Sequence, residues 1–341
     1  MKPNRPYIIA EISANHAGSL ETAKNILVEI AGTGVSAVKL QTFTADQMTV
    51  KSETVKNFIP NTSDLWSGTE LWELMKRAEM PLDWHRELFQ LAASLGLDAF
   101  STPYHPDAVD FLLDLGVTVL KISSFDVVNH PLLERISAAG VPVIMSTGMS
   151  TIEELDEAVS ILIGHVPKLI LLKCTSSYPC SSRDTNIRGV KTLKDRYGIE
   201  VGFSDHSLDE KAACLALTLG ATVFEKHVKL DITSQTLDSE FSATPDSLRS
   251  YVESLKQTES TLGSADIKPV DAEKASLWER PSVVALKHIS LGEVFTHNNI
   301  GVRRPNLGLH PKSLPLLIGR TSTRNYALGE GIFESFQNDV S

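Results

Sequence analysis

Cysteine is scarce in this chain of 341 residues. There are three, Cys174, Cys180 and Cys214, an odd number without the spacing of a metal-binding motif. A secreted protein held together by disulfides usually has an even set of cysteines, so the sequence favours a reducing compartment, the cytoplasm. We also expect no secretory signal, because the polar residues 1–6 lead directly into a strand-like run.

Excess positive charge and long apolar runs are lacking too. Lys and Arg number 32 against 42 Asp and Glu, which gives a formal net charge of -10, and no basic run stands out. This balance argues against nonspecific binding to nucleic acid, although a few local cations would be enough for a small anionic substrate. No apolar stretch approaches the roughly 18–20 residues of a membrane span. The sequence therefore predicts a globular protein that binds neither nucleic acid nor a membrane.

From residue 7 to about residue 262, short apolar runs alternate with longer amphipathic ones. Eight of the short runs are typical of buried strands, at 7–13, 37–43, 98–104, 118–125, 141–148, 169–176, 200–207 and 222–229. Strands that alternate with helices predict a parallel sheet, and eight is the number that closes a TIM barrel. An open doubly wound sheet is the competing interpretation, but it requires no such number. We predict an α/β fold with a (β/α)8 barrel over residues 1–262.

Three stretches depart from this rhythm. Residues 44–80 are longer than an ordinary connection between a strand and a helix, and long loops at the C-terminal face of a barrel usually serve the active site. Residues 263–279 are polar and typical of a linker. Residues 280–341 contain short strand-like runs, turns and prolines, so we predict a small second domain of mainly β character.

Polar residues stand where the predicted strands end. Each strand opens apolar and closes with residues such as Glu11, Lys39, Gln41, Thr102, Lys121, Ser124, Ser146, Ser204 and His227. In a barrel these ends converge on one mouth, where catalysis takes place in this fold. A single Lys or Ser at a strand end is usually only a solvated terminus. Eight strand ends of the same polarity predict a ring of active-site residues.

Two histidines, His206 and His227, take equivalent places at the ends of the seventh and eighth strands. Adjacent strands lie about 4.8 Å apart, so two imidazoles in these places can reach one divalent ion. Asp205 and Glu225 could orient the two rings as hydrogen-bond acceptors. A histidine pair without a motif such as HExxH is weak evidence by itself, and a purely structural role stays open.

Two lysines, Lys39 and Lys121, stand among hydroxyl side chains of the strand ends. Such a cationic, donor-rich set suits a small phosphorylated or carboxylated substrate. Either lysine could instead form a Schiff base with a carbonyl compound, or pair with a buried carboxylate such as Glu11. The residues indicate an aldolase or a synthase and leave the choice between them open.

The order of short motifs resembles the sialic acid synthase family. The motifs are EISANHAG at 11–18, VKLQTF at 38–43, FSTPY at 100–104, LKISSFD at 120–126, IMSTGM at 144–149, KCTSSYP at 173–179, GFSDHS at 202–207 and FEKHVKLD at 224–231. Residues 282–312 resemble the antifreeze-like (SAF) domain with which these enzymes end. Within the family, SSFD at 123–126, DSEFS at 238–242 and RPNLGLHPK at 304–312 are most similar to the pseudaminic acid branch.

The resemblance implies a transferase that forms a carbon–carbon bond. Phosphoenolpyruvate would condense with an open-chain acetamido sugar and water, giving a nine-carbon 2-keto sugar acid and phosphate. In the pseudaminic branch the sugar is a 2,4-diacetamido-2,4,6-trideoxy hexose of the altrose type; legionaminic or N-acetylneuraminic acid synthase is the alternative. The resemblance also implies a divalent metal, Mn²⁺ or Mg²⁺, held by His206 and His227, and a domain-swapped homodimer.

The resemblance also implies a role for each site residue. The catalytic set would be Glu11, Lys39, Lys121, His206 and His227, with Glu11 assisting protonation or activating water. The two lysines would hold phosphoenolpyruvate together with the hydroxyls of Thr102, Ser146 and Ser204. Further substrate contacts would come from Asn15, His16, Gln41, Ser124, Asp126, Ser176, Tyr178, Asp238 and, from the SAF domain of the other subunit, Arg304.

Overall fold

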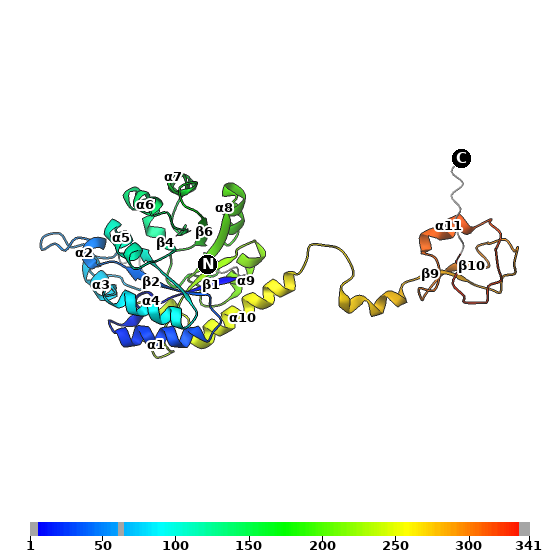
Figure 1. The fold of residues 1–341 in the computed structure, drawn as a ribbon, viewed down its shortest axis with the longest axis horizontal. Helices are drawn as coiled ribbons and strands as arrows, with labels where there is room; N and C mark the ends of the chain where they lie inside the picture. The colour runs from blue at the N-terminus through cyan, green and yellow to red at the C-terminus, as the bar shows by residue number, and fades with distance from the viewer. Residues whose placement is uncertain (1–5, 61–64, 334–341) are drawn as a thin grey trace. The chain divides into compact units, whose positions relative to one another are not determined.

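The computed structural model describes residues 6–60 and 65–333 of the chain. The chain divides into two compact units, residues 1–263 and residues 264–341. The first unit contains the alternating strands and helices, and the second contains the short strands and turns (Figure 1). Among the described residues, no helix is both long and apolar enough to cross a membrane.

Eight parallel strands close into a barrel in the order of the sequence, and the last strand pairs with the first. They are β1 (Tyr7–Glu11), β2 (Ala37–Thr42), β3 (Asp98–Pro103), β4 (Leu120–Ile122), β5 (Val143–Ser146), β6 (Leu169–Cys174), β7 (Glu200–Asp205) and β8 (Val223–His227). The predicted barrel is confirmed. All eight strands end one to three residues earlier than expected, because their polar last residues belong to the loops of the mouth.

A helix follows each barrel strand and packs against the outside of the sheet (Figure 1). These helices are α1 (Leu20–Ala31), α4 (Trp84–Ser94), α5 (Pro106–Asp114), α6 (His130–Ser137), α7 (Ile152–Leu162), α8 (Gly189–Tyr197), α9 (Lys211–Thr218) and α10 (Pro245–Leu262). Helix α7 illustrates why they form: the Thr151 side chain accepts a hydrogen bond from Glu154 N, and the Glu154 side chain caps Thr151 N in return. Such a reciprocal cap satisfies two backbone donors that the first turn leaves unpaired.

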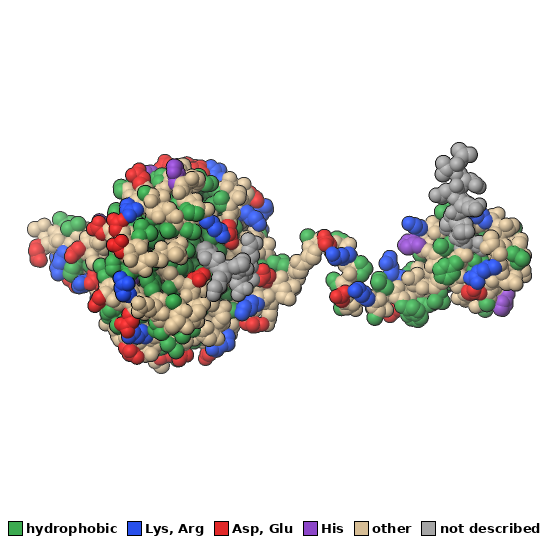
Figure 2. Space-filling view, in the orientation of Figure 1, with side chains coloured by type: hydrophobic (Ala, Val, Ile, Leu, Met, Phe, Trp, Pro, Cys, Tyr) green, Lys and Arg blue, Asp and Glu red, His purple; other side chains and the backbone are tan. Residues whose placement is uncertain are grey.

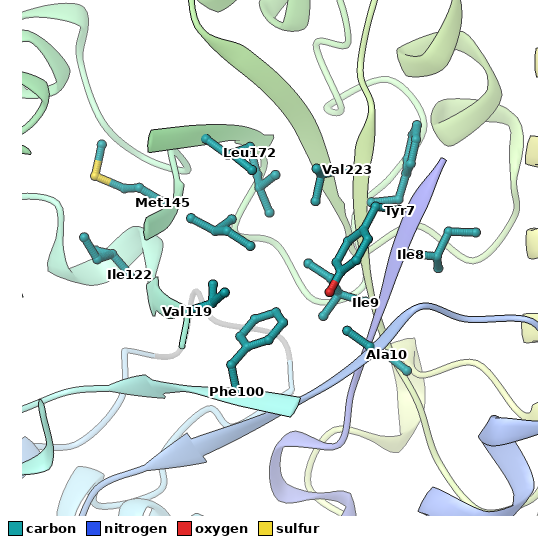
Figure 3. Close-up of a cluster of buried hydrophobic side chains, with 14 of the residues drawn as sticks. Tyr7, Ile8, Ile9, Ala10, Phe100, Val119, Ile122, Met145, Leu172 and Val223 are labelled. Carbon is teal, nitrogen blue, oxygen red and sulfur yellow. The ribbon is translucent and has the colours of Figure 1, made fainter. Parts of the chain in front are cut away.

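The N-terminal halves of the strands fill the inside of the barrel with apolar side chains. Side chains alternate between the inside and the outside along each strand, so Ile9 on β1, Phe100 on β3, Leu172 on β6 and Val223 on β8 share the interior. All four are almost completely buried, and Figure 3 shows them in one cluster. Because this layer is closely packed, any open space in the barrel must lie nearer the C-terminal ends of the strands.

The second unit has a small core of its own. Its strands β9 (Ser282–Ala285) and β10 (Ile300–Arg303) pair antiparallel, and a short helix, α11 (Leu314–Leu317), follows them. The core consists of Val283, Ala285, Ile289, Phe295, Ile300, Leu317, Tyr326 and Ile332. The segment before β9, predicted as a linker, forms two 3-10 turns, Asp271–Glu273 and Ala275–Glu279, neither of which buries a residue.

Charged side chains of both signs are spread over the surface. On the face that Figure 2 shows, Lys and Arg lie scattered among Asp and Glu, and no large basic patch is visible. This distribution agrees with the acidic balance of the sequence.

Candidate active site

A cavity of about 690 Å³ lies at the C-terminal ends of the barrel strands. Most of the residues predicted for the ring contribute to its lining: Glu11, Lys39, Gln41, Lys121, Ser124, Asp126, Ser146, Ser176, Tyr178, Ser204, His206, His227 and Asp238. They come from every strand end except that of β3, although they are far apart in the sequence. The parallel arrangement brings these ends together.

Four buried charges form what we call the charged floor of this cavity: Glu11, Lys39, Lys121 and Glu225. Lys39 Nζ lies 2.6 Å from Glu11 Oε1 and 3.7 Å from Glu225 Oε1. Lys121 Nζ lies 4.0 Å from Glu225 Oε1 and also donates to Ser146 Oγ. The floor therefore brings two lysine side chains and two carboxyl side chains together, each at most 4% exposed.

Burial and ion pairing shift the pKa values of the floor residues in opposite directions. Burial opposes ionisation of Glu11, but the Lys39 ammonium outweighs it and keeps the pKa of Glu11 below its usual value. Gln41 adds a hydrogen bond of 2.8 Å to Glu11 Oε1. Burial lowers the pKa of Lys121, and Glu225 only partly offsets this. An entering anion would compensate Lys121, so the floor is suited to bind one.

The two histidines face each other beside the floor. Their ring centroids are 5.3 Å apart, and Phe241 packs 4.9 Å from the ring of His227. His206 Nδ1 lies 2.9 Å from the Thr175 carbonyl oxygen, which assigns a proton to Nδ1. Burial opposes a charge on this ring, but Cys174 and the Thr175 carbonyl outweigh it and raise the pKa of His206. The structure thus brings the predicted pair together.

His227 has the character of a metal ligand. Burial and then the neighbouring His206 lower its pKa well below the usual value, so the ring is neutral. Its buried Nδ1 makes no hydrogen bond with any described residue, and Asp238 Oδ2 lies 4.0 Å away. A neutral, unpartnered imidazole nitrogen is what a divalent ion requires. Within residues 6–60 and 65–333, no cluster of three or more His, Cys, Asp or Glu side chains could hold an ion, so the two histidines would need water or substrate to complete a site.

The expectation that Asp205 and Glu225 orient the histidine rings is not met. Asp205 points to the outer side of the sheet, where its Oδ1 accepts hydrogen bonds from Ser207 and its Oδ2 lies 3.5 Å from Lys226 Nζ. Glu225 points into the cavity but belongs to the floor. The backbone carbonyl of Thr175 holds the ring of His206 instead. Alternation along β7 explains this, since neighbours on a strand face opposite sides.

Three predicted substrate residues lie away from the cavity lining. Asn15 donates to the Val228 carbonyl at 2.8 Å and to Ser242 at 2.8 Å, and so ties together the loops after β1 and β8. His16 lies edge-on to Trp84 and 3.3 Å from the Ala78 carbonyl. Thr102 is completely buried and accepts a hydrogen bond of 3.1 Å from Lys39. These residues support the site in this structure without reaching into it.

Arg304 belongs to the second unit, which is described by itself. Its side chain is 73% exposed, and Nη1 lies 3.9 Å from Glu279 Oε2. A guanidinium this exposed remains free to bind another group, because a surface ion pair of that length contributes little.

One side of the cavity is apolar, a feature that no motif in the sequence predicts. We call it the apolar wall: Phe43, Met48, Leu71, Leu74, Met75 and Ala78. Phe43 follows β2, Met48 ends the short helix α2 (Ala45–Met48), and the others belong to α3 (Leu71–Ala78). The long segment 44–80 thus lines the cavity, as its length suggested. Cys174, a cavity-lining residue 3.9 Å from His206 Nδ1, was also not identified as part of the site.

The mouth of this eight-stranded barrel holds buried lysines, carboxylates and a histidine pair. Such a site is suited to bind a small anion. Residues 26–267 match the NeuB family and residues 280–335 match the SAF domain, so the chain belongs to the NeuB family.

Its relatives align over most of the chain. The pseudaminic acid synthase of Campylobacter jejuni (strain 81-176) is 37% identical over 96% of both chains. That of Helicobacter pylori (strain 26695) is 40% identical over 94% of both. An N,N'-diacetyllegionaminic acid synthase of Legionella pneumophila is 34% identical over 95% of this chain and 92% of its own. The crystal structure of an N-acetylneuraminic acid synthetase from Leptospira borgpetersenii superposes with a TM-score of 0.72, at 31% identity, over 80% of this chain and 90% of that one.

Proposed function

We propose that this protein is a pseudaminic acid synthase. It condenses phosphoenolpyruvate with an open-chain 2,4-diacetamido-2,4,6-trideoxy hexose of the altrose type and water, and releases phosphate and a nine-carbon 2-keto sugar acid. The observation that carries the proposal is the charged floor beside a histidine pair in one cavity. The extent of the likeness to two pseudaminic acid synthases favours this sugar. A legionaminic or N-acetylneuraminic acid synthase is the alternative.

The floor supplies what phosphoenolpyruvate needs for binding. Its phosphate and carboxylate are both anionic, and Lys39 and Lys121 are two buried cations within reach of the cavity. Charge-assisted hydrogen bonds away from water are stronger than neutral ones, so the two ammonium groups fix both ends of the substrate. The hydroxyls of Ser146 and Ser204 line the same cavity and add neutral donors.

Glu11 is placed to handle protons during the reaction. The methylene carbon of phosphoenolpyruvate attacks the aldehyde carbon, and the aldehyde oxygen takes up one proton. Water then adds to the cationic carbon that results and gives up one proton, and phosphate leaves as the ketone forms. Because Lys39 keeps Glu11 ionised, its carboxylate can accept the proton from the attacking water.

A divalent ion fits the same cavity. His206 and His227 would hold it, because Nδ1 of His227 has no hydrogen-bond partner among the described residues and Nε2 of His206 is available once that ring is neutral. When bound, such an ion would supply Lewis acidity toward the aldehyde oxygen. His227 Nε2 also lies 3.4 Å from Glu11 Oε2, so the same imidazole contacts the carboxylate that handles the proton.

We also propose that the protein works in the cytoplasm as a domain-swapped homodimer, in which Arg304 of one subunit contacts the acyl groups of the sugar in the other. Large apolar side chains are exposed on loops that follow the barrel strands, for example Phe125 (60%), Met149 (60%) and Leu208 (71%), and a partner would cover them. All three cysteines are free, as expected in a reducing compartment.

The swapped arrangement predicts complementation between two inactive variants. Arg304→Ala and Glu11→Ala proteins are purified separately, mixed and allowed to exchange subunits. One site of each mixed dimer then combines an intact barrel with an intact partner arm, and partial activity returns. Inactivity after verified exchange would favour a site completed within one chain.

Phosphate release tests the function directly. The protein is given phosphoenolpyruvate and a panel of acetamido hexoses, and the products are identified by mass spectrometry. We expect the fastest release with the diacetamido trideoxy hexose of the altrose type. Faster release with another acetamido sugar would favour the alternative, and no release with any sugar would reject a synthase. Covalent trapping of the keto acid by borohydride would instead indicate a Schiff-base aldolase.

A further inference from the structure

Helix α3 turns an apolar stripe toward the cavity. Leu71, Leu74, Met75 and Ala78 recur at the spacing that places side chains on one face of a helix, and all four line the cavity. The opposite face is charged and exposed. In a globular protein such a stripe normally packs into the core. Here only Leu74 is buried and the other three stay partly exposed, because they border open space.

The wall differs sharply from the charged floor. Of the described residues in 43–78 that line the cavity, all but Gln47 are apolar. The Gln47 side-chain oxygen already accepts a hydrogen bond of 3.0 Å from Thr44 N and caps α2. Trp66 directs its indole N–H away to the Leu237 carbonyl, at 3.1 Å. A hydroxyl placed against the six apolar side chains of the wall would therefore give up water without gaining a partner from any of them.

The direction of the sugar follows from the proposed chemistry, on which this step rests. The aldehyde carbon must meet phosphoenolpyruvate at the floor, beside the histidine pair. The far end of the six-carbon chain, with its C6 group, then extends away from the floor toward the side of the cavity. The helices α2 and α3 form the apolar part of that side.

We infer that the apolar wall selects a sugar whose C6 is a methyl group. It buries that methyl and rejects the same sugar with a C6 hydroxyl. An apolar pocket discriminates against one added hydroxyl by about ten- to a hundredfold in kcat/KM, and not by more. The wall is thus a specificity determinant for 6-deoxy acetamido sugars that takes no part in the bond-forming steps.

Two near-isosteric variants test this inference, Met75→Gln and Leu71→Asn. Each adds an amide to a partly exposed position of the wall. Leu215→Asn is the matched control, since Leu215 lies on α9, is 54% exposed and does not line the cavity. The measurement is kcat/KM for two diacetamido hexoses that differ only in a methyl or a hydroxymethyl at C5, with phosphoenolpyruvate saturating.

The wild type and the control should prefer the 6-deoxy sugar by about ten- to a hundredfold. Each wall variant should lower that preference by about two- to tenfold, the worth of one neutral hydrogen bond. The KM for phosphoenolpyruvate should not change in either variant. An unchanged preference in both wall variants, with phosphate release intact, would overturn the inference alone. Release from neither sugar by the wild type would overturn the proposed function, and this inference with it.

Discussion

The N-terminal and C-terminal halves of the barrel strands are both buried, but the first carries apolar side chains and the second carries charged and polar ones. On β1, Ile9 is 0% exposed and Glu11 is 2% exposed, and both face the interior two residues apart. Burial of Ile9 stabilises the fold, whereas burial of an ionised Glu11 costs free energy that its pairing only partly offsets. The apolar side chains of the N-terminal halves therefore stabilise the fold. The buried charges of the C-terminal halves are retained because they act on a ligand.

The largest effect on turnover is expected at the C-terminal ends of the strands, at the two histidines. His206→Ala and His227→Ala should each lower turnover at least about a hundredfold, because a bound Lewis acid is worth several kcal/mol. Excess chelator should act on the wild type in the same way. Binding of Mn²⁺, followed by electron paramagnetic resonance, should weaken in both variants while their thermal unfolding stays close to that of the wild type. Full activity in excess EDTA would contradict the metal assignment.

In the apolar layer at the N-terminal halves of the strands, a substitution should reduce stability and leave substrate binding unchanged. Phe100→Ala should reduce the free energy of unfolding by about 3–5 kcal/mol, because it leaves a cavity among closely packed side chains. The remaining folded protein should keep the wild-type KM for phosphoenolpyruvate. Denaturant titration gives the first quantity and steady-state kinetics the second. A raised KM with unchanged stability would show that the two layers are not separable.

Lys121 should affect binding more than folding, whereas Lys39 should affect both, because its loss leaves Glu11 buried without the cation 2.6 Å away. Lys39→Met or Lys121→Met should raise the KM for phosphoenolpyruvate about ten- to a hundredfold, the worth of one charge-assisted contact. Lys121→Met should change stability little, since the cost of burying the ammonium disappears together with its contacts. If both variants respond to phosphoenolpyruvate like the wild type, the lysines are structural.

The smallest effect concerns His85, which lies on the outer side of β2. It is completely buried, its Nε2 lies 2.8 Å from Thr42 Oγ1, and burial lowers its pKa from 6.5 to about 4. As the pH falls below 6.5, the unfolded chain takes up a proton that the folded chain refuses, so stability is lost. Between pH 7 and pH 5 this loss should be about 2 kcal/mol.

His85→Gln removes the titrating group from this position. The variant should be less stable than the wild type at pH 7 but should lose less stability on acidification. Denaturant titrations of both proteins at the two pH values measure this difference, and phosphate release serves as a control that should change little. Equal losses of stability in both proteins would assign the acid sensitivity to other groups.

The fold and most of the ring could be predicted because their signals are local. Eight apolar runs give eight strands, and residues two apart on a strand share a face, so Lys39 and Gln41 both line the cavity. Asn15 and His16 lie in the 3-10 turn Ser13–His16, where this alternation no longer applies. The stripe of α3 has the spacing of any core-facing helix, and only the tertiary structure shows that it borders the cavity.

The apolar wall also bears on how such an enzyme changes over generations. Its side chains come from one uninterrupted stretch of chain between β2 and β3, whereas the reacting groups are spread over strands around the whole barrel. A short deletion, insertion or recombination within that stretch can remodel the sugar pocket and leave the chemistry in place. A new sugar specificity can therefore arise while the catalytic residues stay unchanged. Exchange of one gene segment is enough to begin such a change.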